Sequence, residues 1–378
     1  MLKLCIEGWR NINNSYAIVN QRQLLELLNH KIYLRHKDVP YIYKHWDKIK
    51  NANGFSAEEN IKLNSIEIPK ENEIFDVTYR ISTPFNLGNS NSKKTYIFAT
   101  KEFELKQTMF VNGSVDDFNN RNNFFIAASS NWSKQGFVKY GFNENRIKVV
   151  TLGVNPKIFF PIKLDERDKK RNTLGIKKED FTLLSIGAMT ENKGIKELII
   201  AFALLRKKNK NLKLILKDQS NLYNIFGKVH IRHLKDSRFK DLINDELISN
   251  IIFISKNLNY EQINDLYAVA DCYVSPYLAE GFGLTPLEAS SSGTPIVVTK
   301  GGSTDDYFNP IMGVQINSRL IKVNNFTYLR PNIESLVECI NHIIRNPKNF
   351  GGRKSHEYIA EHLSIKKSVK KLIKEISL

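Results

Sequence analysis

The sequence predicts an α/β protein with two doubly wound parallel sheets. Three observations support this fold class. In the second half of the chain, short apolar runs bounded by turn residues alternate with segments of helical periodicity, which is typical of βαβ units. The first half follows the same plan less legibly. The length of 378 residues favours two domains over a single core.

The first half contains apolar runs that we expect to form buried strands, because each is short and bounded by turn residues. These runs cover residues 2–7, 95–100, 123–129 and 147–153. Residues 21–28 have helical spacing, with Ser15 as a possible N-cap upstream. Residues 48–94 are polar and carry no assignable pattern.

The second half alternates strand and helix throughout. We expect strands at 181–187, 212–217, 250–255, 272–276 and 294–299, and helices at 194–208, 260–270 and 286–292. In the first of these helices, Ile195, Leu198, Ile199 and Phe202 have the spacing of one buried face. Such sheets bind ligands beyond the carboxyl ends of their strands, so two of them facing each other would form a central cleft.

A change in composition marks the predicted domain boundary. Residues 161–180 are charged and contain no apolar run. We therefore expect a first domain at 1–165, a linker at 166–180 and a second domain at 181–352. A C-terminal helix at 353–378 would pack back on the first domain.

The end of that segment, "LSIKKSVKKLIKEISL", has an amphipathic pattern. Apolar residues share one helical face, and lysines lie largely elsewhere. Two interpretations follow: the helix lies on an anionic membrane, or it packs on the protein with its lysines solvated, and the second is favoured. The apolar residues are Ile365, Val369, Leu372, Ile373 and Ile376, and the lysines are Lys366, Lys367, Lys370, Lys371 and Lys374.

Composition narrows the classes of partner. The net charge of +17 suggests an anionic partner, or only a lysine-rich composition, and no nucleic-acid motif is present. Neither a signal-peptide pattern nor an apolar run of roughly 20 residues is present, so we expect a cytoplasmic protein, with possible peripheral contact to the inner face of a membrane. Cys5, Cys272 and Cys339 read as reduced core residues, and His230 and His233 lack further ligands for a metal.

The stretch "AEGFGLTPLEASSSGTP" at 279–295 carries the chemistry. One interpretation is structural: Thr285 as N-cap, Pro286 as the first helical residue and Glu288 three positions after the cap form a capping box. Gly293 then ends the helix with a positive φ.

The same stretch also favours a ligand site, because Gly281 and Gly283 allow a tight turn that leads into a helix N-terminus. A helix N-terminus favours an anion such as a diphosphate. Glu280 beside it would repel phosphate but can accept hydrogen bonds from sugar hydroxyls. Upstream, a strand ends at Gly187, and Lys193 precedes the next helix, where an amine can reach a phosphate. Together these residues predict a nucleotide-sugar site.

Several of these segments resemble glycosyltransferases of family 4 with the GT-B fold. "EGFGLTPLEASSSGTPIVVT" is similar to the signature of that family, in which two glutamates are separated by seven residues. "LLSIGAMTENKGIKELIIAFALL", "LYAVADCYVSP" and "IAASSNWSKQGFVKYGFNENRIKVVTLGVNPKIFFP" resemble other parts of it. The resemblance covers most of residues 124–310 and implies two Rossmann-like domains facing a central cleft, the first for the acceptor and the second for the donor.

The resemblance also implies roles for residues. A nucleoside-diphosphate sugar would bind to the second domain, with Glu280 on sugar hydroxyls and Glu288 on the ribose. Lys193 would neutralise the diphosphate. Backbone N–H groups of Phe282, Gly283 and Leu284 would face the sugar and phosphates, with Thr285 nearby. Family members retain the anomeric configuration, generally need no metal or other cofactor, and are thought to use a front-face mechanism.

The sequence departs from the family pattern in two places. Ala188 stands where the family usually has a phosphate-binding arginine, and Lys217 at the end of a strand could substitute for it. In the first domain, Ala99 and Thr100 stand where many members carry a histidine near the reacting sugar. Surface or core roles suit His30, His36 and His45 better, and Arg10, Ser15 and Tyr16 read equally as cleft or loop residues.

The expected function is therefore a retaining transfer of a sugar from a GDP- or UDP-linked donor to a hydroxyl of a glycan, a lipid-linked sugar or a small molecule. Contacts to the base are expected near Ser255 and Lys256. Two alternatives remain: a GT-B relative with another reaction, such as an epimerase or phosphorylase, and a non-catalytic protein that binds a nucleotide sugar.

Overall fold

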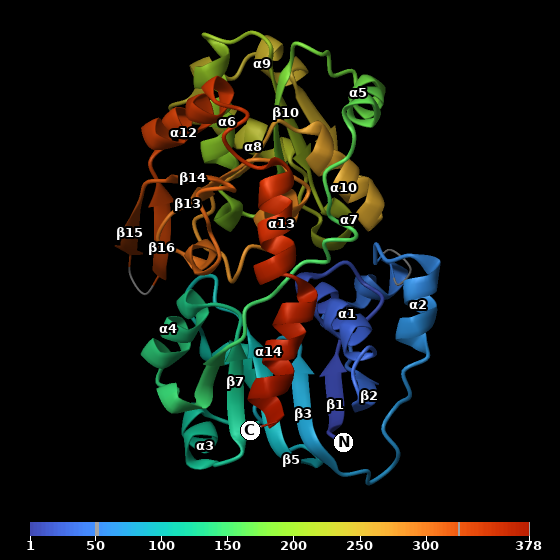
Figure 1. The fold of residues 1–378 in the computed structure, drawn as a ribbon. Helices are drawn as coiled ribbons and strands as arrows, with labels where there is room; N and C mark the ends of the chain where they lie inside the picture. Colours follow the sequence, from blue (N-terminus) through green and yellow to red (C-terminus); the bar gives the residue numbers. More distant parts are fainter. Residues whose placement is uncertain (50–52, 324–325, 378) are drawn as a thin grey trace. The chain divides into compact units, whose positions relative to one another are not determined.

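The computed structural model describes residues 1–49, 53–323 and 326–377 (Figure 1). The chain divides into two compact units. Unit 1 comprises Met1–Gly153 and Ile365–Leu378, and unit 2 comprises Val154–Ser364. Each unit contains a six-stranded parallel sheet covered by helices, as the predicted α/β fold class requires.

The sheet of unit 1 has the strand order β2-β1-β3-β5-β7-β8. The predicted strands near residues 2, 95, 123 and 147 are confirmed. Two others were not predicted, because β2 is an edge strand with alternating charges and β3 lies in the polar region that carried no assignable pattern. The bounds are β1 Lys3–Gly8, β2 Tyr33–Asp38, β3 Phe75–Ile81, β5 Ser92–Ala99, β7 Phe124–Ala128 and β8 Ile147–Val149, with a small pair β4 Phe85–Asn86 and β6 Phe110–Val111.

Helices cover both faces of this sheet (Figure 1). They are α1 Ser15–Leu27, α2 Ala57–Asn64, α3 Val115–Asn120, α4 Asn131–Tyr140 and α14 Ile365–Ser377, with 3₁₀ turns η1 Lys44–Ile49, η2 Gln107–Met109 and η3 Glu144–Arg146. The N-cap of α1 is Asn14 rather than the predicted Ser15, since the Asn14 side chain accepts from the Tyr16 N–H.

The sheet of unit 2 has the order β11-β10-β9-β12-β13-β14, and all five predicted strands of this half are present. The bounds are β9 Phe181–Ile186, β10 Leu212–Lys217, β11 Ile251–Ile254, β12 Cys272–Ser275, β13 Ile296–Thr299 and β14 Gly313–Ile316. After β14 the chain forms an antiparallel hairpin that was not predicted, β15 Ser318–Val323 and β16 Phe326–Pro331.

The predicted helices of unit 2 are confirmed, and the face of α6 that we expected to be buried lies in the main core cluster. The helices are α5 Leu164–Thr173, α6 Ile195–Arg206, α7 Ser220–Tyr223, α8 Lys228–Lys235, α9 Asp245–Ser249, α10 Tyr260–Val269, α11 Leu284–Ser291, α12 Ile333–Arg345 and α13 Gly352–His362, with η4 Glu191–Lys193, η5 Lys240–Leu242 and η6 Ser303–Asp306.

The segment 166–180, expected as a linker, is instead part of unit 2. It contains most of α5, which packs against α10. Arg167 and Arg171 both bind the carboxylate of Asp271, at 2.6 Å and 3.0 Å, and both donate to the carbonyl of Val269. The segment is therefore held by arginine hydrogen bonds rather than by an apolar face, which is why its composition suggested a linker.

The C-terminal segment 353–378 forms two helices rather than one. A bridge between Ser364 and Val154 separates α13, which belongs to unit 2, from α14, which belongs to unit 1. The apolar side of α14 is buried on unit 1, with Val369, Leu372 and Ile376 in the core. Its lysines are exposed, so the favoured packing interpretation of the amphipathic pattern is confirmed.

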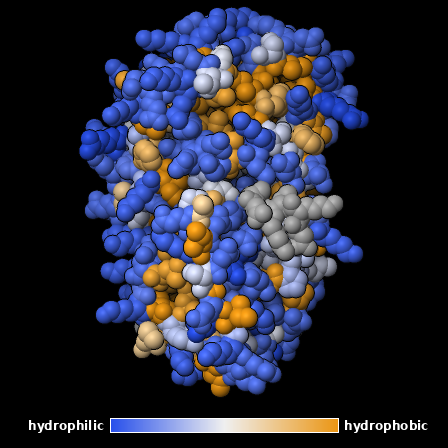
Figure 2. Space-filling view, turned by 90° about the vertical axis from the view of Figure 1, so that its right-hand side faces the viewer, coloured by the Kyte–Doolittle hydropathy of each residue, from blue (hydrophilic) through white to orange (hydrophobic). Residues whose placement is uncertain are grey.

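No helix within the described residues is long and apolar enough to span a bilayer. The face drawn in Figure 2 is mostly hydrophilic, and its apolar colour gathers in separate areas.

Candidate active site

The turn into helix α11 is built on Gly283. This residue has φ +86° and caps the helix without any side-chain cap bond. A Cβ at Gly283 would lie 3.0 Å from the hydroxyl of Tyr307, which itself donates to the carbonyl of Gly283 at 2.7 Å. The N-terminal N–H groups of α11 thus have no capping side chain, and this is the arrangement that favours a bound anion.

The predicted capping box is wrong. The positive φ of Gly283 starts the helix earlier, so Thr285 is already helical and does not cap it. Its hydroxyl instead accepts from the hydroxyl of Tyr273 at 2.8 Å. Glu288 is buried, and the hydroxyl of Tyr267 donates to its carboxylate at 2.8 Å. The prediction for the other end of the helix is confirmed, since Gly293 has φ +81°.

Lys193 and Glu280 form an ion pair beside this turn. Their Nζ and Oε2 atoms are 2.5 Å apart, and the side chains are 22% and 15% exposed. Asn192 joins the two loops, because its carbonyl accepts from the N–H of Leu278 at 2.7 Å and its side-chain amide donates to the carbonyl of Ala279 at 3.1 Å. The structure therefore brings together the two residues that the sequence analysis singled out from separate motifs.

Close approach of these loops requires a glycine. Gly194 caps α6 with φ +67°, and a Cβ there would lie 1.9 Å from the carbonyl oxygen of Pro276. The chain after β9 therefore lies directly against the chain after β12. The side chain of Lys193 reaches Glu280 from this position.

Tyr273 links the strand ends to the helix. Its hydroxyl lies 2.8 Å from the Thr285 hydroxyl and 3.2 Å from the carbonyl of Ile186, the last residue of β9. Burial raises the pKa of Tyr273, so the phenol stays neutral and remains a donor. This one side chain fixes the carboxyl ends of β9 and β12 relative to the start of α11.

The loop after β9 contains Gly187 and Ala188, where the family arginine is absent. The next residue, Met189, has φ +52°, and its carbonyl lies 2.7 Å from Nε2 of buried His230. Because a carbonyl only accepts, Nε2 carries the proton. Burial lowers the pKa of His230, which favours the neutral ring. Within the described chain, its Nδ1 has no hydrogen-bond partner.

Lys217 ends β10 next to this loop, because the N–H of Gly187 donates to the Lys217 carbonyl at 3.1 Å. The Lys217 side chain is buried and its ammonium donates to the carbonyl of Asp218. Burial lowers the pKa of Lys217, since the charged form loses hydration. The Asp218 carboxylate accepts from the hydroxyl of Ser255 at 2.9 Å, whereas Lys256 is exposed.

The remaining candidates have local structural contacts in unit 1. Arg10 makes two hydrogen bonds to the carboxylate of Asp38, and the Tyr16 hydroxyl lies 3.1 Å from that of Thr100. Ser15 is exposed at the start of α1. Among the residues that the structure describes, no three His, Cys, Asp or Glu side chains gather in a way that could hold a metal.

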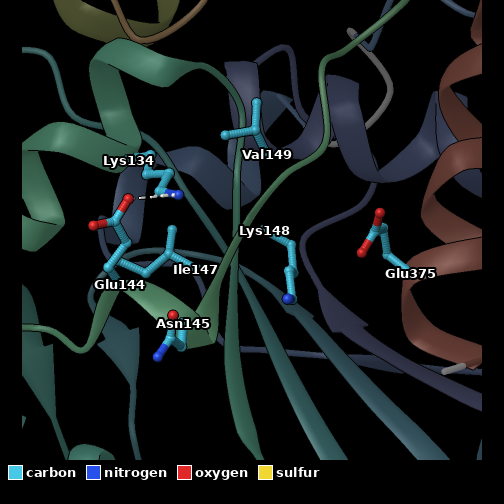
Figure 3. A pocket seen from close by; sticks show the side chains of 7 residues that line it. All are labelled: Lys134, Glu144, Asn145, Ile147, Lys148, Val149 and Glu375. Atoms are coloured by element: carbon cyan, nitrogen blue, oxygen red, sulfur yellow. Dashed lines mark ion pairs between the residues drawn. The ribbon is translucent and has the colours of Figure 1, made fainter.

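A polar hollow of about 480 Å³ also lies in unit 1, lined by residues from α4, η3, β8 and α14 (Figure 3). Lys134 and Glu144 form a 3.0 Å ion pair on one side, and Glu375 of α14 lies on the other. The hollow carries both signs of charge and contains none of the predicted site residues.

Sequence reasoning missed the tyrosines at 267, 273 and 307, which orient Glu288, Thr285 and Gly283. Tyr267 and Tyr273 occur in apolar runs, and Tyr307 follows two aspartates in a loop. Nothing in a single sequence distinguishes the first two from ordinary core residues or Tyr307 from an ordinary loop residue. Asp218 was missed as well, although its place after β10 was a usable signal.

Two curated relatives illustrate what the chain is similar to. D-inositol 3-phosphate glycosyltransferase of Paenarthrobacter aurescens is 29% identical over 163 residues, 43% of this chain and 37% of the relative. Mannosylfructose-phosphate synthase of Agrobacterium fabrum is 29% identical over 43% of this chain and 34% of the relative. The matched regions thus span little more than a third of these curated relatives.

Solved structures match over the full chain. HepE from Anabaena, in complex with UDP and glucose, has a TM-score of 0.67 at 14% identity and covers 100% of both chains. A glycosyltransferase from Rickettsia africae has a TM-score of 0.69 at 15% identity, covering 100% of this chain and 98% of its own. This likeness shows the GT-B fold. The family model "Glycosyl transferases group 1" matches residues 166–362, more than half of the sequence, and the chain belongs to that family.

Proposed function

We propose that the chain is a retaining hexosyltransferase of glycosyltransferase family 4. It transfers a sugar from a GDP- or UDP-linked donor to a hydroxyl of a glycan, a lipid-linked sugar or a small molecule. The observation that carries this proposal is the Lys193–Glu280 ion pair beside the uncapped N-terminus of α11. A carboxylate and a row of N–H donors in one turn, with a cation from the neighbouring loop, match the parts of a nucleotide sugar.

The diphosphate binds at the start of α11. Backbone N–H groups at 282–284 and the helix dipole favour its negative charge, and Lys193 supplies a positive charge from the neighbouring loop. Gly281 and Gly283 have no side chain to block close approach. Preorganised donors of this kind stabilise charge that develops on the leaving phosphate.

The two glutamates hold neutral hydroxyl groups. Glu280 accepts hydrogen bonds from the sugar, and Glu288 accepts them from the ribose while Tyr267 orients its carboxylate. Ser255 and Lys256, at the end of the sheet after β11, lie nearest the base.

Lys217 replaces the absent arginine in the proposed site. It lies beside Gly187 at the neighbouring strand end, and its buried ammonium donates to a backbone carbonyl. A diphosphate at this edge of the sheet favours the ammonium form of Lys217, because an anion nearby offsets the cost of burying the charge.

The reaction needs no redox partner. The bond between the anomeric carbon and the β-phosphate oxygen breaks, and the acceptor oxygen bonds to the same face of that carbon. The proton of the acceptor hydroxyl passes to the leaving diphosphate. Lys193 and the N-terminus of α11 stabilise the charge on that leaving group.

The comparisons support the donor class. The relatives are named as glycosyl- and mannosyltransferases, and structures of HepE contain UDP or UDP-glucose. A nucleoside-diphosphate hexose is therefore the first donor to test.

The test measures acceptor-dependent nucleotide release from a panel of UDP- and GDP-hexoses. We expect Glu280→Gln to lower kcat/KM by about 100-fold or more. Glu191→Gln is the matched control, because Glu191 lies on the same loop as Lys193 but is 80% exposed and pairs with Lys196. Comparable activity in the two variants would refute the assigned role of Glu280. Free epimerised sugar without acceptor, or donor binding without turnover, would refute transferase activity itself.

A further inference from the structure

One buried histidine in unit 2 has no role in the proposed reaction as described so far. His230 and His233 come from the stretch "HIRH", whose spacing suits metal ligands, yet among the described residues no group of side chains that could hold a metal includes them. The two rings differ in the structure, since His230 is 3% exposed and His233 is exposed on the same helix, α8. A buried polar ring costs hydration, so its contacts must offset that cost.

Helix α8 holds this ring in a fixed place. Ile231 and Leu234 lie on the buried face of the helix and belong to the core cluster of unit 2, and α8 contacts α6 (Figure 1). The start of α8 is tied to the end of β10, because the N–H of Gly227 donates to the carboxylate of Asp218 at 3.0 Å. Side chains on an anchored helix are positioned more precisely than side chains on a loop.

The His230 ring binds the loop that follows β9. Its Nε2–H donates to the carbonyl of Met189 at 2.7 Å. Met189 is 1% exposed, so loss of this donor would leave a buried carbonyl without its partner. Met189 also has φ +52°, a conformation that is strained for a residue with a side chain. Such strain persists only where neighbouring groups hold it, and His230 is one of those groups.

The hydrogen bond fixes the orientation of the peptide plane between Met189 and Thr190. This peptide bond is trans, and in a trans peptide the carbonyl oxygen and the following N–H point in opposite directions. Because the Met189 carbonyl is turned toward His230, the Thr190 N–H points away from the buried ring. Within the part of the chain that the structure describes, this N–H donates to no protein acceptor. It is therefore available to a ligand.

Thr190 lies on the same loop as Lys193. It follows the carboxyl end of β9 and precedes η4, which ends at Lys193. The Thr190 hydroxyl donates to the side-chain carbonyl of Asn192 at 2.5 Å, and the Asn192 amide donates to the carbonyl of Ala279, the residue before Glu280. The orientation of this peptide thus belongs to the loop that presents Lys193 to the proposed diphosphate.

The surroundings of His230 favour a neutral ring. Burial is the largest cause that lowers its pKa, and Lys196 of α6 and His233 of α8 lower the pKa further. The hydrogen bond to Met189 and the carboxylate of Glu191 act in the opposite direction, and the pKa is lowered on balance. A neutral ring with its proton on Nε2 is a donor and not a charge, so His230 does not supply the cation that the family arginine would.

We propose that His230 is a positioning residue of the donor site, which holds the Met189–Thr190 peptide so that the Thr190 N–H donates to the diphosphate. The inference rests on the proposed function, because it gives the proposed diphosphate a further contact beside Lys193. Hydrogen bonds from N–H groups to an ionised acceptor are stronger than those between neutral groups. This contact would therefore offset part of the loss of the arginine where the chain has Ala188.

The test is calorimetric titration of the full chain with UDP-glucose, UDP, GDP-mannose and GDP. His230→Leu removes the donor, and we expect the affinity for the sugar nucleotide that the unchanged protein binds to fall by about tenfold. His230→Gln keeps an N–H donor at a similar reach and should bind within about twofold of the unchanged protein. His233→Leu is the matched control, because it makes the same change at an exposed position of the same helix, and its affinity should not change.

The diphosphate alone separates the assigned contact from general damage to the site. His230→Leu should weaken UDP or GDP by the same factor as the matching sugar nucleotide, whereas Glu280→Gln should weaken the sugar nucleotide and not the diphosphate. Urea denaturation shows which variants fold. If His230→Leu does not fold, His230→Asn takes its place, because its amide is too short to reach the Met189 carbonyl, and the same losses are expected.

Three results would overturn the positioning role and leave the proposed function intact. They are equal affinities of the unchanged protein and His230→Leu, a loss for the sugar nucleotide without a loss for its diphosphate, and equal losses in His230→Leu and His230→Gln. In the last case the hydrogen bond would not be the cause. An unchanged protein that binds none of the four nucleotides would refute the proposed function, and this inference with it.

Discussion

Replacing Gly194 by alanine tests whether the contact between the two loops builds the site. Gly194 has φ +67°, and an added Cβ would lie 1.9 Å from the carbonyl oxygen of Pro276. The chain contains a matched control, since Gly175 has φ +68° and a Cβ there would meet no atom within 4 Å. Both substitutions impose the same backbone conformation on an alanine, and only one of them creates a steric overlap.

The expected losses of stability follow from two energy terms, the cost of the left-handed backbone conformation and the cost of the steric overlap. A left-handed conformation costs a non-glycine residue about 1–2 kcal/mol, and this term applies to both variants. Overlap in a packed region adds about 1–3 kcal/mol, and the upper end applies at Gly194 because the atom met is backbone. We therefore expect the free energy of unfolding to fall by about 1–2 kcal/mol for Gly175→Ala and by about 4–5 kcal/mol for Gly194→Ala.

Urea denaturation of both variants measures this difference, and calorimetric titration with a nucleotide sugar measures the site. Gly194→Ala should also weaken donor binding, because relief of the overlap moves Lys193 away from Glu280. Gly175→Ala should bind as the unchanged protein does. Equal losses of stability in the two variants would refute the reasoning, since the overlap would then contribute nothing.

Three further predictions concern buried polar groups. Tyr267→Phe removes the hydroxyl that donates to Glu288. It should lower the free energy of unfolding by about 1–3 kcal/mol and weaken donor affinity. Unchanged affinity in calorimetric titration would show that Tyr267 does not contribute to donor binding. Lys217→Met should leave the urea midpoint unchanged or higher, because a buried charge is costly, yet lower donor affinity about tenfold; full affinity would exclude a diphosphate contact. Burial lowers the pKa of His36 from 6.5 to about 3. Between these two pH values the unfolded chain binds a proton at His36 that the folded chain does not. The free energy of unfolding should therefore fall by about 2 kcal/mol from pH 6.5 to 5. In His36→Gln, urea denaturation at the two pH values should show a smaller change in the free energy of unfolding. An equal change in the variant and the unchanged protein would show that His36 does not cause the pH dependence.

The fold was predictable where a buried segment is rich in apolar residues. The strands of unit 2 lie between two helical layers, so runs such as "IVVT" at 296–299 are buried on both faces. β2 was not predicted because, at the edge of the sheet, Arg35 and Lys37 alternate with only two buried residues, Leu34 and His36, and one of these is polar. Segment 166–180 was misassigned because arginine hydrogen bonds hold it, and such bonds have no sequence period.

The site was predictable as a set of residues and less so as a geometry. Glycines and acids around Glu280 indicated a turn and a helix start, and the structure has both. The capping box failed because the sequence pattern that it uses is local, whereas Tyr273 reaches Thr285 from another strand. No local pattern records a hydrogen bond of that kind.

The ion pair between Lys193 and Glu280 explains how one small turn can hold groups of opposite charge under the proposed function. In the empty protein each side chain neutralises the other, so neither charge remains partly buried without a partner. An arriving diphosphate competes for Lys193 with two negative charges against one. Glu280 then loses its cation and turns to the neutral hydroxyl donors of the sugar, which a carboxylate accepts without repulsion. Exchange of partners thus couples phosphate binding to sugar binding, and a nucleoside diphosphate without a sugar would leave Glu280 unpaired. We therefore expect the binding free energy of the intact donor to exceed that of its diphosphate product. The expected difference is the cost of leaving the Glu280 carboxylate without a partner, about 1–3 kcal/mol.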